Sequence, residues 1–364
     1  MAGRTCAAGV AAFAYHGGAL DVARRLAPDA PQPWIDLSTG INPYAYPLPD
    51  LAPDVWTRLP ASEALAQLEA AAARRYRAEP EAVVAGPGSQ ALIQALSRIT
   101  PCGAVGVLGP TYGGHAEAFA ASGANVVEAS SLGPLERCDV AIVVNPNNPD
   151  GRITSRADLL ELHERLDRRR GLLIVDEAFA DFDGVDESLL PALPAASAVV
   201  LRSFGKTFGL AGLRLGFAIA SPDVGEPLRA ALGPWPVSGP AIAIGTKALL
   251  DLDWTAAMAA RLGEEAARLG ALLVECGWRV LGGTRLFRLA AREDAGEVFE
   301  RLLKAGILAR PFPNASDRLR FGIPGEEAHW ERLAAELSSK HNLTQRLTYQ
   351  TSLMEQDDET RPSG

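Results

Sequence analysis

One lysine, with a serine before it and an arginine after it, forms the most informative pattern in this chain. Lys206 lies among small residues directly after the apolar run 198–201. Ser203 precedes it and Arg214 follows it in the same glycine-rich segment. A lysine at the end of a strand can form a Schiff base, while a nearby hydroxyl and guanidinium hold a phosphate. The pattern is therefore compatible with a lysine that forms a Schiff base beside a bound phosphate.

Two other interpretations of this segment must be weighed. Gly205-Lys206-Thr207 ends like a nucleotide-binding P-loop, but that motif requires glycine five residues before Gly205, where the chain has Val200. A P-loop is therefore excluded. An ordinary surface lysine in a glycine-rich turn stays open on this segment alone.

A possible anion site lies earlier in the chain. Gly88, Ser89 and Gln90 open a helix predicted over residues 89–99. Backbone N–H groups at a helix N-terminus, together with a serine hydroxyl, can bind a phosphate. A plain turn followed by an N-cap would use the same residues.

Three further polar motifs follow apolar runs. Tyr112 could lie flat against a planar ring with His115 behind it, although a core tyrosine and a surface histidine are the alternative. Asn148 stands in a turn that two prolines stiffen, which can aim its amide at a ligand. Asp176 ends a buried run, where a carboxylate is costly unless it meets a cation such as a pyridinium nitrogen. A capping or metal-binding aspartate is the alternative.

The elements that must position these residues alternate along the chain. Apolar, β-branched runs predict buried strands over residues 105–108, 140–144, 172–175 and 198–201. Helical periodicity separates them over 89–99 and 156–170, and a further helix is expected over 62–77. Such alternation predicts an α/β fold with a mainly parallel sheet covered by helices on both faces. Ligands collect at the carboxyl ends of such strands, where the polar motifs fall.

Taken in this order, the motifs resemble the fold-type I pyridoxal-phosphate enzymes, the aspartate aminotransferase superfamily. The resemblance covers roughly residues 35–330. It implies pyridoxal 5'-phosphate as cofactor, a large domain with a mainly parallel sheet, a small α+β C-terminal domain and a homodimer.

The resemblance also implies roles for individual residues. Lys206 would bind the cofactor covalently and move protons, Asp176 would pair with the pyridine nitrogen, and Asn148 would donate to the ring oxygen. Tyr112 would stack on the ring. The cofactor phosphate would be held by Gly88, Ser89, Gln90, Ser203 and Arg214. Arg320 would grip the α-carboxylate of the substrate.

Within the superfamily, the chain resembles the histidinol-phosphate aminotransferases and the L-threonine-O-3-phosphate decarboxylases of cobalamin biosynthesis. His16-Gly17-Gly18 and the segment 36–43, which includes Gly40, favour the decarboxylases, as does Phe179 at a position where aminotransferases carry tyrosine. We therefore expect a lyase acting on a phosphorylated amino acid, with His16 and Gly40 at the substrate. Histidinol-phosphate or related aromatic aminotransferase activity is the alternative, and a protein that holds the cofactor without turnover is a third.

One departure from the family concerns Leu59. The family has tyrosine there, reaching the cofactor phosphate of the neighbouring subunit, so this hydrogen bond is lost.

The expected organisation has four parts. Residues 1–40 form an irregular N-terminal arm, 41–238 the large cofactor-binding domain, 239–340 the small domain, and 341–364 a polar tail predicted to be disordered.

Bulk composition limits the class of protein. The 364 residues carry a net charge of −9, which argues against a nucleic-acid partner. No apolar run is long enough to cross a membrane, the start makes a poor secretion signal, and the four cysteines are widely spaced. These features predict a cytoplasmic protein with reduced thiols, no zinc site and no membrane segment.

Overall fold

The structure is a computed structural model of the whole chain that describes residues 13, 17–193 and 197–338. The chain forms two compact units. The large unit comprises residues 40–265 and 282–286, and the small unit comprises the remainder. The four predicted domain limits stay predictions, and the predicted polar tail, 341–364, lies outside the described residues.

A seven-stranded sheet forms the centre of the large unit, in the order β2-β8-β7-β6-β5-β3-β4. Its strands are β2 (Val83–Gly86), β3 (Ala104–Leu108), β4 (Asn125–Ala129), β5 (Val140–Val144), β6 (Leu172–Asp176), β7 (Ala198–Ser203) and β8 (Gly216–Ala220). Neighbours from β4 to β7 run parallel, and only β8 pairs antiparallel with β7 and β2. The predicted mainly parallel sheet and its four predicted strands are confirmed.

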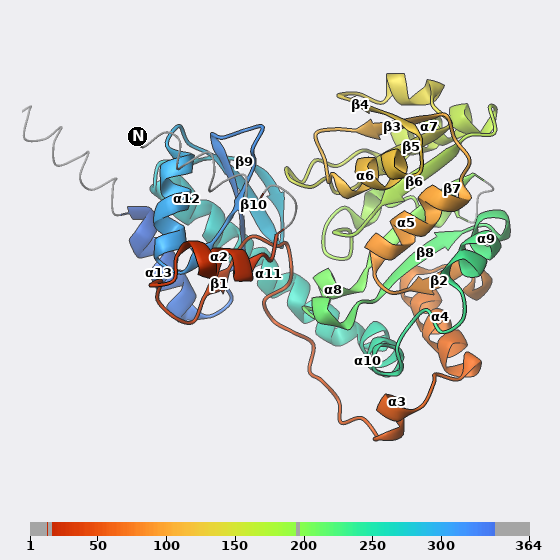
Figure 1. Cartoon of the computed structure of the whole chain (residues 1–364), viewed down its shortest axis with the longest axis horizontal. Coiled ribbons are helices and arrows are strands. Elements are labelled where there is room, and N and C mark those ends of the chain that lie inside the picture. Colours follow the sequence, from red (N-terminus) through yellow and green to blue (C-terminus); the bar gives the residue numbers. More distant parts are fainter. Residues whose placement is uncertain (1–12, 14–16, 194–196, 339–364) are drawn as a thin grey trace, which may run out of the picture. The chain divides into compact units, whose positions relative to one another are not determined.

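Helices cover both faces of this sheet, as predicted (Figure 1). Alternate strand residues point to opposite faces. On one face Val143, Val175 and Val200 pack in a core with α4, α7 and α10. On the other face Ile142 and Ile174 pack with α5, α6 and α9. These helices span Ser62–Tyr76 (α4), Ser89–Ile99 (α5), Gly114–Ala121 (α6), Arg156–Asp167 (α7), Pro222–Leu232 (α9) and Gly239–Leu250 (α10).

Two short helices and one long one complete the described helices of the large unit. They are α3 (Asp54–Thr57), α8 (Phe204–Thr207) and α11 (Leu252–Glu275), whose last ten residues belong to the small unit. Short 3₁₀ turns follow at Pro80–Ala82, Gly133–Arg137, Val185–Glu187, Leu190–Ala192 and Ala211–Leu213.

The strand register brings the polar motifs to one edge of the sheet. Val144 pairs with Asp176, and Asp176 pairs with Leu201, so β5, β6 and β7 end side by side. Gly216, the first residue of β8, pairs with both Ser203 and Gly86. The turns that follow these strands therefore emerge at the same edge.

The small unit contains two sheets and flanking helices. A four-stranded sheet has the order β12-β13-β10-β9, with β13 antiparallel to both β12 and β10. Its strands are β9 (Arg279–Thr284, whose last three residues belong to the large unit), β10 (Phe287–Ala291), β12 (Arg310–Pro311) and β13 (Arg318–Gly322). The helices that lie wholly in this unit are α2 (Leu20–Leu26), α12 (Ala295–Lys304) and α13 (Glu327–Ser338). An α+β C-terminal domain was predicted, and the antiparallel sheet with its helices agrees with that fold class.

The irregular character expected for the first forty residues is wrong for part of that stretch. Residues 20–26 form α2, with Ala23 fully buried, and β1 (Ile35–Asp36) pairs parallel with β11 (Ile307–Leu308). The partner strand is distant in sequence, so local composition gave no signal for this pairing.

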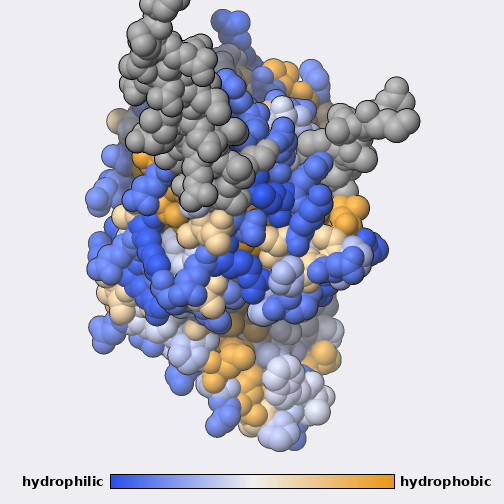
Figure 2. Space-filling view, turned by 90° about the vertical axis from the view of Figure 1, so that its left-hand side faces the viewer, coloured by the Kyte–Doolittle hydropathy of each residue, from blue (hydrophilic) through white to orange (hydrophobic). Residues whose placement is uncertain are grey.

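Hydrophilic residues dominate the face drawn in Figure 2, and hydrophobic residues form small separate groups there. Among the residues that the structure describes, none of the helices has both the length and the apolar character needed to cross a bilayer.

Candidate functional site

The N-terminus of α5 and Arg214 meet at the carboxyl edge of the large sheet. Gly88 has a φ of 87°, and a Cβ atom there would lie 2.8 Å from a guanidinium nitrogen of Arg214. A Cβ atom on Gly216, the partner of Ser203, would lie 2.5 Å from the backbone nitrogen of Ser89. No side chain caps α5, so the partial positive charge of its first turn adds to that of the guanidinium. This arrangement suits a phosphate group.

Tyr112 is held in place by a residue of that same helix. Its hydroxyl donates to Oε1 of Gln90 over 2.8 Å. A Cβ atom on Gly114 would lie 2.5 Å from the tyrosine ring, so the chain passes directly against one side of the ring. The edge of the ring meets His115, with the two centroids 6.0 Å apart and the planes at 85°. The hydrogen bond to Gln90 therefore helps to fix the position of the Tyr112 ring.

For His115, the sequence left two positions open: behind Tyr112 at the ring, or on the surface. The alternative of a surface histidine is wrong, because its side chain is fully buried. Its Nε2 lies 2.8 Å from Oδ2 of Asp176, and no described residue hydrogen-bonds to its Nδ1. No pattern in the sequence pairs residues 115 and 176, which lie on different elements.

The carboxylate of Asp176 is buried and ionised. Burial raises its pKa, but the hydrogen bond and charge of His115, the charge of Lys206 and the N–H of Ala178 together outweigh burial, so the pKa lies below its ordinary value. The Ala178 N–H donates to Oδ1 over 3.1 Å. Asp176 therefore offers a fixed negative charge at the end of β6, which is the property that a pyridinium partner requires.

Lys206 lies in α8 beside this carboxylate and is half-buried. Its Nζ is 4.2 Å from the centroid of the Phe179 ring. The aromatic face of Phe179 thus covers the amine at the position where the resemblance implies a tyrosine in the aminotransferases.

Asn42 fixes the backbone that carries Lys206. The Asn42 N–H donates to the carbonyl of Lys206 over 2.9 Å, and its side-chain amide donates to the carbonyl of Thr207 over 3.0 Å. Sequence reasoning noted the segment around Asn42 as a family resemblance but assigned this residue no role.

The turn with Asn148 is stiffened by its neighbour Asn147. The buried Asn147 amide donates to the Pro110 carbonyl over 3.0 Å and to Asp150 over 2.7 Å, and its oxygen accepts from Thr111 over 2.6 Å. Asn148 is half-buried at the end of β5. The predicted turn is present, and the Asn147 side chain is one of the groups that hold it.

In the small unit, Arg320 is buried on β13. Its guanidinium donates to the Ser38 carbonyl over 2.7 Å, and its Cζ lies 4.9 Å from the centroid of the Phe287 ring. Ser38 in turn binds Asp36 and accepts from the N–H of Gly18 over 2.7 Å. The segment that follows the predicted His-Gly-Gly motif therefore contacts the predicted carboxylate-binding arginine.

A second arginine, which sequence reasoning missed, lies across from Arg320. Arg310 on β12 is its register partner. Burial and the charge of Arg310 lower the pKa of Arg320, while Asp36 acts in the opposite direction. Two arginines on directly paired strands repel each other unless anions lie nearby. The sequence shows only that the two arginines stand ten residues apart, and the strand register is what places them opposite each other.

The remaining predicted positions are placed as follows. His16 lies outside the described residues. Gly40 is buried at the start of the large unit, and Leu59 is 69% exposed.

No metal centre is formed by the described residues, because they contain no cluster of three or more His, Cys, Asp or Glu side chains placed around a common point. Cys102, Cys138 and Cys276 are present as thiols.

The chain belongs to the aminotransferase class I and II family, whose model matches residues 32–337. This is the class that the mainly parallel sheet, the strand-end lysine and the buried aspartate define.

Two relatives are similar over almost their whole length. The threonine-phosphate decarboxylase of Pseudomonas aeruginosa is 44% identical over 327 residues, which is 88% of this chain and 96% of the relative. The threonine-phosphate decarboxylase of a Sinorhizobium species is 41% identical over 325 residues, covering 89% of this chain and 97% of the relative.

A solved structure shares the fold. The histidinol-phosphate aminotransferase of Sinorhizobium meliloti, determined in complex with pyridoxal-5'-phosphate, superposes with a TM-score of 0.74 at 20% identity. The match covers 88% of this chain and 93% of that one.

Proposed function

We propose that this protein is a pyridoxal-phosphate-dependent carboxy-lyase that converts L-threonine O-3-phosphate to (R)-1-amino-2-propanol O-2-phosphate in cobalamin biosynthesis. The observation that carries the proposal is the identity of 44% to a threonine-phosphate decarboxylase over nearly the full length of both chains.

The residues of the large unit fit the cofactor. The cradle at Gly88 and Arg214 would be filled by a Cβ atom, and it suits a phosphate. Asp176 is a buried anion suited to a protonated ring nitrogen. Pyridoxal phosphate, when bound, supplies an electron-withdrawing ring that takes up the electron pair left when a bond at the substrate Cα breaks.

The chain's own residues would then have distinct tasks. Lys206 Nζ would attach the cofactor and deliver a proton to Cα after carbon dioxide leaves, so that one C–C bond breaks and one C–H bond forms. Asp176, held by His115, would keep the ring nitrogen protonated. Tyr112 would lie against the ring, and Asn148 would donate to the ring oxygen. The cofactor phosphate would be held by Gly88, Ser89, Gln90, Ser203 and Arg214.

The small unit would bind the two anionic groups of the substrate. Arg320 would hold the α-carboxylate, and its strand partner Arg310 would hold the phosphate. Gly40 and His16, which lies outside the described residues, stay predicted substrate-binding residues. Two adjacent cations suit a substrate that carries two anions, and that substrate would relieve their repulsion.

We further propose a cytoplasmic homodimer without nucleic-acid partners. In the large unit Trp56, Leu59 and Trp235 are 66%, 69% and 56% exposed, which supports burial of this region against a second copy. Sedimentation of the purified protein would test the dimer.

The deciding experiment is incubation of the cofactor-loaded protein with L-threonine O-3-phosphate and no keto acid. We expect repeated release of carbon dioxide, with the visible absorbance of the lysine-bound cofactor restored after each turnover. Conversion to the pyridoxamine form with histidinol phosphate, without carbon dioxide, would instead establish the aminotransferase alternative. Binding of the cofactor with neither reaction would favour a protein that does not turn over.

A further inference from the structure

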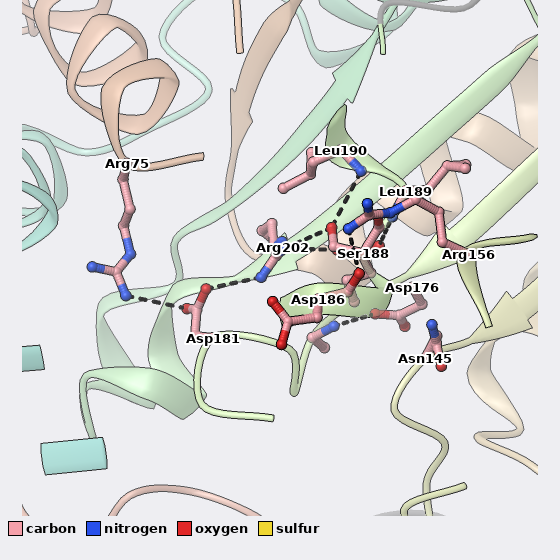
Figure 3. Close-up of polar contacts among 12 residues, drawn as sticks. Arg75, Asn145, Arg156, Asp176, Asp181, Asp186, Ser188, Leu189, Leu190 and Arg202 are labelled. Carbon is pink, nitrogen blue, oxygen red and sulfur yellow. Dashed lines mark hydrogen bonds and ion pairs between the residues drawn. The ribbon is translucent and has the colours of Figure 1, made fainter. Parts of the chain in front are cut away.

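A buried ion cluster lies next to Asp176 in the sequence and includes the neighbours in sequence of three site residues. Figure 3 shows Arg202 and Asp181 pointing toward each other in this cluster. Glu177 follows Asp176, Arg202 precedes Ser203, and Thr207 follows Lys206. None of these three neighbours has a task in the reaction proposed above.

Arg202 joins two carboxylates through separate nitrogens. One terminal nitrogen donates to Glu177 over 2.6 Å, and the other donates to Asp181 over 3.0 Å. The side chains of Arg202 and Glu177 are 4% and 0% exposed. Burial lowers the pKa of Arg202, but the two carboxylates outweigh burial and raise it, so the group is a fixed cation.

Each carboxylate also accepts hydrogen bonds from a second segment of the chain. Asp181 accepts a hydrogen bond of 2.5 Å from the Thr207 hydroxyl, which ties it to α8 next to Lys206. Glu177 accepts from the Ser188 hydroxyl over 2.6 Å and from the Leu189 N–H over 2.8 Å. The loop that follows Asp176 is thus joined to α8 by the hydrogen bond between Thr207 and Asp181, and to β7 by the Arg202 guanidinium.

Charge and burial indicate why the cluster is present. Arg75 approaches Asp181 at 4.0 Å, so two arginines face two carboxylates and the group is neutral overall. Buried ion pairs add little net stability compared with apolar residues of similar size, because each ion loses its hydration. Directional hydrogen bonds between these charges fix the position of the loop and strand that carry them more specifically than apolar packing would.

We propose that Arg202, with Glu177, Asp181 and Thr207, forms a positioning cluster that sets Lys206 Nζ relative to Asp176. This inference rests on the proposed cofactor chemistry of Lys206 and does not depend on which substrate is used.

The test uses Thr207→Val, Thr207→Ser and Arg202→Lys in the cofactor-loaded protein. Valine matches threonine in shape but cannot bind Asp181, serine keeps the hydroxyl, and lysine keeps the charge but offers a single nitrogen. We expect Thr207→Val and Arg202→Lys to lower kcat about tenfold with KM changed less than about twofold, since small misplacement of a reacting group slows chemistry. Thr207→Ser should restore the wild-type values.

Two readouts are independent of turnover. The pH titration of the visible absorbance of the Lys206-linked cofactor should shift in Thr207→Val and Arg202→Lys but not in Thr207→Ser. In the cofactor-free protein, amide hydrogen exchange of residues 203–209 should be faster in the same two variants.

Arg229→Lys serves as the matched control. Arg229 also forms a partly buried ion pair in the large unit, with Glu69 at 2.7 Å, but contacts none of the site residues named above. It should lower the melting temperature without changing the absorbance titration.

The proposal is overturned if Thr207→Val and Arg202→Lys lower only the melting temperature, or if Arg229→Lys shifts the titration equally. Failure of the proposed function would look different, because the wild-type protein itself would then show no lysine-bound cofactor band or would release no carbon dioxide.

Discussion

In the large unit, the buried Asp176 carboxylate lies 2.8 Å from His115, and the charge of the half-buried Lys206 lowers the pKa of that carboxyl. In the small unit, Arg310 and Arg320 lie across paired strands with Asp36 as the nearby carboxylate that influences Arg320. In the first region the chain itself supplies partners of opposite charge to a buried anion, whereas in the second region two cations lie directly opposite each other on paired strands. This difference supports the proposal that the first region binds the cofactor and that the second binds the anionic groups of the substrate.

The largest expected effect on activity comes from removing the amine of Lys206 in the proposed cofactor site. Lys206→Ala should reduce carbon dioxide release by at least about 10⁴-fold, because both covalent attachment and proton delivery depend on this amine. Stopped assays with the loaded protein and the absorbance spectrum would measure it. Full activity with an unchanged spectrum would contradict the assignment of Lys206.

A change in the small unit should weaken the use of substrate but leave the cofactor undisturbed. Arg320→Lys removes the bidentate contact, and we expect kcat/KM to fall by about 10²- to 10³-fold. The absorbance spectrum of the loaded protein without substrate should stay unchanged, because Arg320 has no proposed contact with the cofactor. A changed spectrum would show that the two regions are not separate in function.

His115→Phe tests the charge balance around Asp176. The variant removes the hydrogen bond, so burial should raise the pKa of Asp176 above its wild-type value. The free energy of unfolding should fall by about 2 kcal/mol at neutral pH, the usual scale for a hydrogen bond to a charged group. Urea unfolding of the cofactor-free protein would measure it.

The sign of the pH dependence follows from the lowered pKa. Ionised Asp176 stabilises the wild-type fold above its ordinary pKa of 3.8, and this contribution is lost as the pH falls through the lower folded value. The difference between wild type and His115→Phe should therefore shrink in acid. Tyr112→Phe, which loses a neutral hydrogen bond to Gln90, should give a difference that does not change with pH.

The smallest expected effect concerns the excess charge in the small unit. Arg310→Gln removes one of two repelling cations, so the cofactor-free protein should gain up to about 1 kcal/mol in stability. The same variant should raise KM for L-threonine O-3-phosphate. A loss of stability together with an unchanged KM would contradict the proposal that these two arginines bind the anionic groups of the substrate.

Local sequence was sufficient for the strand-end motifs. Buried parallel strands read as apolar runs, and polar residues after such runs must gather at one edge of the sheet, so Asp176, Lys206 and Asn148 could be grouped in advance. The helix over 89–99 could be predicted for the same reason, since its glycine start and apolar period are local. The roles of these residues in the reaction remain predictions.

Contacts between distant segments could not be obtained in this way. Packing brings together His115 and Asp176, and strand register brings together Arg310 and Arg320. The loop after Asp176 brings two carboxylates to Arg202. No periodicity in the sequence encodes these contacts. The sequence by itself determined the fold class and the order of the motifs, because these depend on residue type and local spacing, and the family resemblance of those motifs implied the cofactor. Only the tertiary structure decided which charges meet, because a buried charge is stabilised by whatever side chain the fold places beside it.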